Sequence, residues 1–168
     1  MLSRLRSTLL LALLAALAPA VGASPDLGRV EAAIVDRTNQ FRRDERLRTV
    51  DVDRKLARAA RAFANYMADT DRYGHEVDGK KPSQRVKIQG YDYCLVSENI
   101  AYQYSSRVLS TEELGGRYFE AWKNSPGHRR NMLEPAARDT AVAVAQSATG
   151  YYYAVQLFGR PQSAGCPR

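Results

Sequence analysis

Apolar residues recur at helical spacing in two long segments of the first half of the chain. Asp26 can cap the first segment, which continues to about Leu47. Asp53 can cap the second, which gives way to a loop near Thr70. The apolar positions are Leu27, Val30, Ile34 and Phe41 in the first segment and Leu56, Ala60, Phe63 and Met67 in the second. Because each set falls on one side of a helix, both segments are predicted to be helices that pack against a core.

Two further helices are indicated by signals at their ends. Pro82–Gln89 is compatible with a short helix that Gly90 would end, because glycine readily takes the left-handed conformation found after helices. Ser110 and Glu113 form a capping box, in which each side chain can bond an amide of the other's turn. A helix is therefore predicted to begin at Ser110.

Tyr93–Tyr102 is predicted to be a strand that carries a carboxylate on an apolar face. Alternation of side chains along a strand places Glu98 on the same face as Val96, Ile100 and Tyr102. Burying a lone carboxylate is costly, so Glu98 is expected to have a cation, a metal or several donors nearby, or else a raised pKa. The alternative is a carboxylate at a strand end that accepts from backbone amides.

Alternating apolar and polar residues predict a β-hairpin near the end of the chain. Its strands are residues 140–146 and 151–158, joined by a turn at 147–150. The tyrosine run at 151–153 is interpreted as strand filler and edge rather than as a stacking platform. Residues 159–168 are expected to form a tail.

The stretch Trp122–Met132 is typical of the end of one helix, a break and the start of another. Asn124 can close the first helix. Ser125 and Pro126 can start the second, because a serine oxygen accepts from free amides and proline lacks the amide that would stay unpaired. His128 then lies in a first turn, where amide dipoles favour the neutral ring that binds a metal or accepts a proton. A histidine that only packs or forms a hydrogen bond is the alternative.

Residues 1–23 have the features of a secretory signal peptide. Two arginines precede an apolar run at 9–17, and small residues at 21–23 suit cleavage before residue 24. The apolar run is too short to span a bilayer comfortably, and no later segment is long enough. We therefore expect residues 24–168, about 145 residues, to form one domain that is secreted or periplasmic.

Cys94 and Cys166 are the only two cysteines of the chain. In an oxidising compartment they are expected to form a disulfide that ties down the C-terminal tail. Two unpaired thiols are the alternative.

The chain is basic, with a net charge of +7 that falls to +5 without Arg4 and Arg6, because all 18 acidic residues lie beyond the signal. The densest basic region comprises Arg42, Arg43, Arg46, Arg48, Arg54, Lys55, Arg58 and Arg61. Acidic residues are interleaved with it, so we expect a solvated face with helical ion pairs; attraction to anionic envelope polymers or lipid headgroups is an alternative. Nucleic acid is not an expected partner, since no nucleic-acid module is recognisable.

The candidate chemical residues are the two histidines, His75 and His128, and Glu98. Their wide separation has none of the short spacing of a His-Glu-x-x-His helix or a Cys-x-x-Cys knuckle. The chain also lacks a Gly-x-Ser-x-Gly elbow for a serine hydrolase. Spacing gives no reason to pair Glu98 with Glu76 or Glu120 for glycan hydrolysis.

Four motifs, in this order, closely resemble the CAP superfamily, also called SCP-like. They are Thr38–Arg42, Gly74–Glu76, Ser97–Ala101 and Trp122–Met132. That superfamily includes cysteine-rich secretory proteins, insect antigen 5 and plant pathogenesis-related proteins, and this chain is similar to its compact bacterial branch. The resemblance covers essentially everything after the signal and implies an α+β fold. The expected architecture is a three-layer α-β-α sandwich with helices on both faces of a small, mainly antiparallel sheet.

The resemblance also implies a central cleft where two histidines and two glutamates can hold zinc or another divalent ion. His75 and His128 match the histidines, and Glu98 matches the first glutamate. Ser125 stands at the second glutamate position, and Glu120 lies roughly 140° away around the helix, too far to replace it. The expected zinc site thus has three protein ligands and an open position for water, or binds metal poorly. Further expected cleft residues are Ser125, Glu76 and Asn99.

Export, a metal-type cleft and the lack of a recognisable nucleophile lead to a functional hypothesis. The chain is expected to be a non-enzymatic binding protein whose cleft takes a lipid, a cell-envelope component or a protein partner. The alternative is a zinc-assisted, peptidase-like hydrolase, in which metal-bound water attacks an envelope substrate. That enzyme would need a general base, and none is evident beyond Glu76. A purely structural domain is a third possibility.

Overall fold

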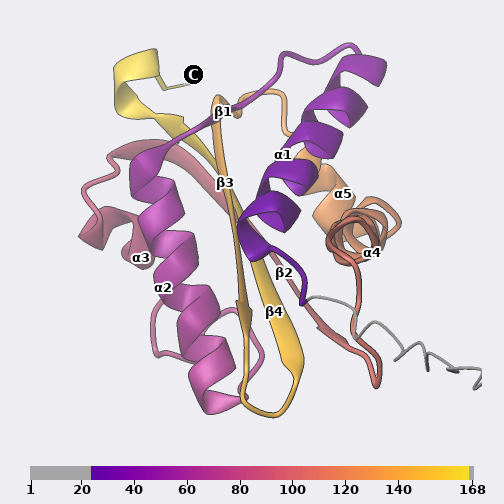
Figure 1. Ribbon diagram of the computed structural model, residues 1–168. Coiled ribbons are helices and arrows are strands. Elements are labelled where there is room, and N and C mark those ends of the chain that lie inside the picture. The colour runs from indigo at the N-terminus through magenta and orange to yellow at the C-terminus, as the bar shows by residue number, and fades with distance from the viewer. Residues whose placement is uncertain (1–23, 167–168) are drawn as a thin grey trace, which may run out of the picture.

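The computed structural model describes residues 24–166, in which a small sheet lies between two layers of helices (Figure 1). The expected α+β architecture and three-layer arrangement are confirmed. The signal peptide expected at residues 1–23 lies outside the described residues. Among residues 24–166, no helix is both long enough and apolar enough to cross a membrane.

The sheet has four strands in the order β1-β3-β4-β2. They are β1 (Asp51–Val52), β2 (Tyr93–Tyr104), β3 (Asp139–Gln146) and β4 (Tyr151–Pro161). The predicted hairpin is β3 with β4, and β2 runs antiparallel to β4 on the other side. Only the short β1 is parallel to its neighbour β3. The sheet is therefore mainly antiparallel, and β2 forms one of its edges.

One face of the sheet is covered by α1 (Leu27–Asp44), α4 (Thr111–Lys123) and α5 (Pro126–Met132). The core on this side is dominated by large side chains that water does not reach. They include Ile34, Leu114, Tyr118, Trp122, Met132 and Phe158. Trp122 also donates from Nε1 to the carbonyl oxygen of Ile100 at 3.2 Å, which fixes α4 against β2.

The other face is covered by α2 (Arg54–Thr70) and α3 (Pro82–Ile88). A second core lies between these helices and the sheet. It includes Leu56, Phe63, Met67, Val86, Ile100, Val155 and Leu157. The alternation that was predicted for the strand around Glu98 therefore places that carboxylate on this second core face.

Local capping signals explain where most of the helices begin. The side chains of Asp26 and Asp53 accept from amides in the first turns of α1 and α2, as predicted. Helix α1 ends at Asp44, earlier than the expected Leu47, because Arg46 takes a left-handed conformation with φ 58°. The capping box at Ser110 forms only in part. Its Glu113 carboxylate instead pairs with two arginines, Arg107 and Arg117.

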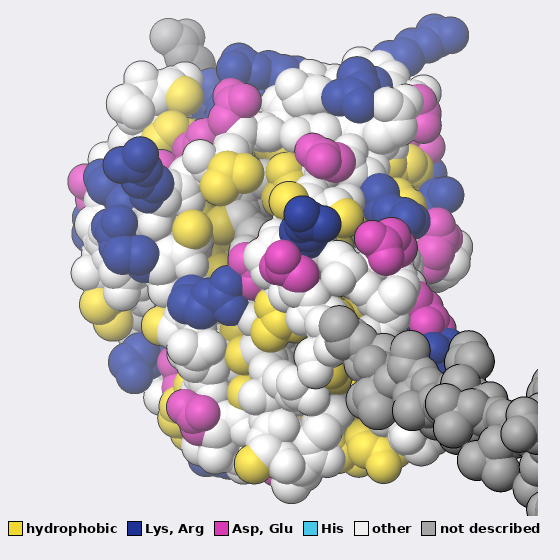
Figure 2. All heavy atoms as spheres, in the orientation of Figure 1, with side chains coloured by type: hydrophobic (Ala, Val, Ile, Leu, Met, Phe, Trp, Pro, Cys, Tyr) yellow, Lys and Arg dark blue, Asp and Glu magenta, His cyan; other side chains and the backbone are white. Residues whose placement is uncertain are grey.

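The expectation of a wholly solvated basic face is wrong for Arg42, which is fully buried. Arg42 donates from Nε to the carbonyl oxygen of Arg48 at 2.8 Å, and from Nη1 to those of Met132 and Glu134 at 2.7 and 3.1 Å. It thereby joins the end of α1 to the end of α5. On the face of the molecule that is drawn in Figure 2, exposed basic and acidic side chains are interleaved.

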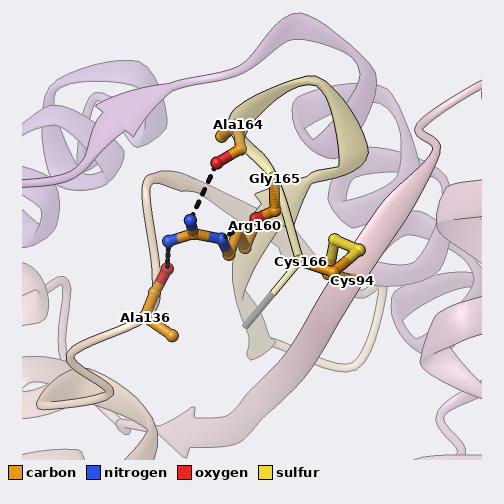
Figure 3. Close-up of a disulfide and its surroundings, with 6 residues drawn as sticks. All are labelled: Cys94, Ala136, Arg160, Ala164, Gly165 and Cys166. Atoms are coloured by element: carbon orange, nitrogen blue, oxygen red, sulfur yellow. Dashed lines mark hydrogen bonds between the residues drawn. A yellow bond between two sulfur atoms is a disulfide. The ribbon is translucent and has the colours of Figure 1, made fainter. Parts of the chain in front are cut away.

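The C-terminal segment is held by a disulfide and by hydrogen bonds from Arg160 (Figure 3). Strand β4 continues to Pro161, so the expected tail begins later than residue 159. A disulfide joins Cys94 in β2 to Cys166, as expected, with their Cα atoms 5.2 Å apart. Arg160 donates to the carbonyl oxygens of Ala164 at 2.8 Å and Ala136 at 3.3 Å, and also to that of Gly165. The tail is thus fixed to the beginning of β2.

Replacing both cysteines by serine is expected to lower the free energy of unfolding. The cysteines are 72 residues apart, and losing a cross-link over such a loop costs about 4 kcal/mol in the chain-entropy model. Urea unfolding of the Cys94→Ser/Cys166→Ser variant and the parent protein measures the difference. An unchanged midpoint and slope would contradict this expectation.

The substitution Arg42→Met is expected to destabilise the protein by about 2–4 kcal/mol, because three carbonyl oxygens, one buried and two partly buried, would lose their donor. Thermal unfolding measures this effect. The matched control is Arg43→Met, which removes a neighbouring arginine that is exposed. Equal, small effects of the two substitutions would show that Arg42 does not hold α1 to α5.

Candidate functional site

Glu98 lies in the middle of β2 with only 1% of its side chain exposed. Its neighbours along the strand on the same face include Ile100, which belongs to the core beneath α2. The strand period thus forces an ionisable group into an apolar layer. The sequence required this carboxylate to have a compensating partner, and the structure identifies it.

The partner of Glu98 is the guanidinium of Arg85, from the short helix α3. Nη2 of Arg85 lies 3.0 Å from Oε1 and 2.8 Å from Oε2 of Glu98. Nη1 donates to Oδ1 of Asp78 at 2.9 Å, and the guanidinium carbon lies 3.5 Å from the ring centroid of Phe63. The expected cation near Glu98 is confirmed. The alternative, in which the Glu98 carboxylate accepts from backbone amides at a strand end, is not observed. Sequence reasoning missed Arg85 itself, although a buried glutamate was a reason to look for a cation.

His75 is the second residue that contacts Glu98. Its Nδ1 lies 2.9 Å from Oε1 of Glu98, and its carbonyl oxygen accepts from Nη2 of Arg85 at 2.9 Å. Because a carboxylate oxygen only accepts, Nδ1 is the donor in this contact. Half of the His75 side chain is exposed, so the ring remains partly open to solvent. His75 and Glu98 are therefore brought together as the family resemblance implied.

His128 lies in the first turn of α5, as predicted. Asn124 ends α4 and Pro126 begins α5, but the Ser125 side chain forms no capping hydrogen bond, so that part of the prediction is wrong. Burial, and then the nearby His75, hold the pKa of His128 below its ordinary value. The ring is therefore neutral near pH 7, as the sequence predicted.

Asn99 places His128 beside the sheet through a buried network. Its Nδ2 donates to the carbonyl oxygen of His128 at 3.2 Å and to Oε1 of Gln156 at 3.0 Å. Its Oδ1 accepts from Nδ2 of Asn131 at 2.8 Å. Gln156 in turn donates to Thr38 of α1 at 3.0 Å. Asn99 is thus a positioning residue that faces away from the Glu98 side of β2.

The remaining expected cleft residues do not join Glu98. Glu76 is exposed in the loop after α2, and Ser125 lies half-buried at the start of α5. Within residues 24–166, no group of three or more His, Cys, Asp or Glu side chains is arranged so that it could hold a metal ion.

The residues of the cleft do not fit a divalent ion. Both oxygens of Glu98 already accept from the Arg85 guanidinium, and Oε1 also accepts from His75. A divalent ion at Glu98 would stand beside a fixed positive charge, and Ser125 supplies no carboxylate to offset it. These residues are therefore poorly suited to hold zinc.

Five tyrosines form a continuous aromatic cluster that is partly exposed; Tyr153, at 4% exposure, is its buried member. We call this the tyrosine surface; it consists of Tyr73, Tyr102, Tyr104, Tyr151 and Tyr153. Ring centroids of adjacent members are 4.9 to 6.3 Å apart. Tyr73, Tyr102 and Tyr104 are about half exposed, at 45, 50 and 55%.

The interpretation of the tyrosine run as strand filler holds for Tyr152, which is buried in the core beneath α1 and α4, and for Tyr153, which is buried in the core beneath α2. Tyr151 pairs across the strands with Tyr104, and Tyr153 pairs with Tyr102. Sequence reasoning considered the run alone, whereas the surface combines β2, β4 and the loop before His75. The pairing of two tyrosine-rich strands was the signal that would have revealed it.

An apolar pocket of about 260 Å³ lies on the other side of Arg85. Ala59, Phe63, Tyr66 and Ile88 form much of its lining. Neither histidine nor Glu98 contributes to this pocket, so it is separate from the cleft.

Comparison with known proteins gives a consistent result. Residues 35–158 match the model of CAP, the cysteine-rich secretory protein family. The uncharacterised protein YkwD of Bacillus subtilis is 30% identical over 131 residues, which are 77% of this chain and 47% of YkwD. The chain thus spans about half the length of this curated relative.

Solved structures show the same fold. An outer surface protein of Borrelia burgdorferi superimposes with a TM-score of 0.70 at 20% identity, covering 83% of this chain and 98% of that one. An extracellular protein of Bacillus anthracis that contains an SCP domain gives 0.63 at 24% identity, covering 79% and 41%. With four motifs, the sandwich and these matches in agreement, the chain belongs to the CAP family, in its bacterial branch.

Proposed function

We propose that this chain is an exported, non-enzymatic binding protein that recognises a component of the cell envelope through the tyrosine surface and the adjoining cleft. The observation that carries this proposal is the position of Tyr73. Its ring contacts Tyr102 at a centroid distance of 4.9 Å, and it precedes His75 by one glycine. The exposed aromatic surface and the histidines of the cleft are therefore neighbouring parts of one surface.

The cleft supports recognition better than hydrolysis. Glu98 is 1% exposed and hydrogen-bonded to Arg85 and His75, so it is poorly placed to act as a general base on a bound substrate. The nearest hydroxyl on β2, Oγ of Ser97, is buried and has no hydrogen-bond partner among the described residues. A serine without a base is a weak nucleophile. The zinc-assisted alternative needs a metal-bound water as nucleophile, which the residues around Glu98 do not suit, and its candidate base, Glu76, is exposed in the loop after α2.

The tyrosine surface suits an amphipathic ligand. Each ring offers an apolar face, and each phenol adds a hydroxyl that can donate and accept. The one carboxylate bonded to it, Asp71, already accepts from Tyr153 and Thr149. An envelope molecule with both apolar and hydroxyl-bearing parts would match this combination.

Export is supported by the expected signal peptide and by the disulfide, because disulfides persist in oxidising compartments. The Bacillus anthracis relative is described as extracellular. Secretion and a periplasmic location are both compatible with these features.

The double substitution Tyr102→Ser/Tyr104→Ser is expected to weaken binding at least about fivefold, since each aromatic contact contributes about 0.5–1.5 kcal/mol. The protein is expressed in its own host with its leader and isolated from the envelope. Mass spectrometry then compares the envelope molecules that copurify with it and with the variant. Circular dichroism confirms that the variant is folded.

The matched control is Val52→Ser, which changes another exposed apolar side chain on the far edge of the sheet. Equal recovery of envelope molecules with both variants, or none with the parent protein, would overturn the proposal. Loss with Ile88→Ser instead would assign binding to the pocket beneath Arg85.

A further inference from the structure

We propose that the guanidinium of Arg85 stands in this cleft where other proteins place a divalent metal ion, so that the cleft contains its own cation and does not load one. This inference goes beyond the proposed function and does not depend on which ligand binds. It rests on the oxygen atoms around Arg85, on their burial, and on the segment of chain that they hold.

Four oxygen-bearing groups surround the guanidinium. The two carboxylates are Asp78 and Glu98, at 2.9 and 2.8 Å. The two backbone carbonyls belong to Lys80 and His75, at 2.7 and 2.9 Å. Carboxylates and carbonyls are the groups that enclose hard cations such as calcium in proteins. Arg85 thus occupies a shell of the kind that a bound ion would otherwise need.

Burial makes this internal cation hard to replace. The side chains of Arg85, Asp78 and Glu98 are 6, 10 and 1% exposed. An incoming ion would have to displace the guanidinium from Glu98 and leave it buried without that partner, which is strongly unfavourable. Without that displacement, the ion would face the guanidinium at short range and be repelled.

The shell also explains what the cation does for the fold. Three of its four groups, those of His75, Asp78 and Lys80, come from the single connection between α2 and α3. The fourth, Glu98, lies in β2. Arg85 therefore fastens the loop that carries His75 to the sheet, as structural metal ions fasten loops elsewhere.

Zinc titration by calorimetry tests the metal part of the inference, using the protein from residue 24 onward. In the parent protein and in the Ser125→Glu variant, we expect no zinc binding at His75 and His128. The double variant Arg85→Gln/Ser125→Glu removes the guanidinium and supplies the family's second carboxylate, and it is expected to bind zinc at least about 100-fold more tightly. Binding by the parent protein that is lost in both His75→Ala and His128→Ala would overturn the proposal.

Hydrogen exchange of residues 71–81 tests the fastening part. Arg85→Gln is expected to speed exchange in this segment at least about tenfold, with little change in α1. The matched control is Arg58→Gln, which removes an exposed arginine that bonds only Gln89. Unchanged exchange in Arg85→Gln would contradict the role assigned to Arg85.

A second variant keeps this test decisive if Arg85→Gln does not fold. Arg85→Lys retains the charge but has a single nitrogen, so it can reach only part of the shell. Faster exchange of residues 71–81 than in the parent protein supports the proposal, and unchanged exchange overturns it. Addition of EDTA is expected to leave the melting temperature of the parent protein unchanged, and a fall would also count against the inference.

Discussion

The ion pair between Glu98 and Arg85 is the constraint on which this side of the molecule depends. Strand periodicity fixes Glu98 on a core face, and a buried carboxylate requires an opposite charge. Only a residue that reaches the core from outside the strand can supply it, and the short helix α3 brings Arg85 there. The path of the loop before α3 and the orientation of His75 both follow from that requirement.

The charge of Glu98 is offset by Arg85, and this limits the chemistry of the residues around it. The imidazole of His75 is oriented by Glu98 and half exposed, while the pKa of His128 is lowered mainly by burial. Two imidazoles and a row of phenols then face solvent, and none of them is activated by a free base. Such a surface can donate, accept and stack, which are the interactions of recognition. The fold is common to the family, but the residue chemistry decides the function.

The sequence was most informative where the structure depends on residues that are close together along the chain. Asp26 and Asp53 cap helices through amides two or three residues away, so their roles were readable from local pattern. The roles of Arg42 and Arg85 were not, because Arg42 was assigned to a solvated face and Arg85 was not singled out. Met132, which accepts from Arg42, is 90 residues away in the chain. Tertiary packing decides whether an arginine is buried, and the periodicity of apolar residues does not indicate which arginine that is.

The departure at Ser125 and the presence of Arg85 have to be considered together. Losing one carboxylate weakens a metal site, but a buried Glu98 would remain and would still need a positive charge. Arg85 meets that need permanently, because a guanidinium keeps its charge at all ordinary pH values and does not exchange with solvent ions. Because this cation is a side chain of the protein itself, Glu98 has its partner, and a glutamate in place of Ser125 is not required.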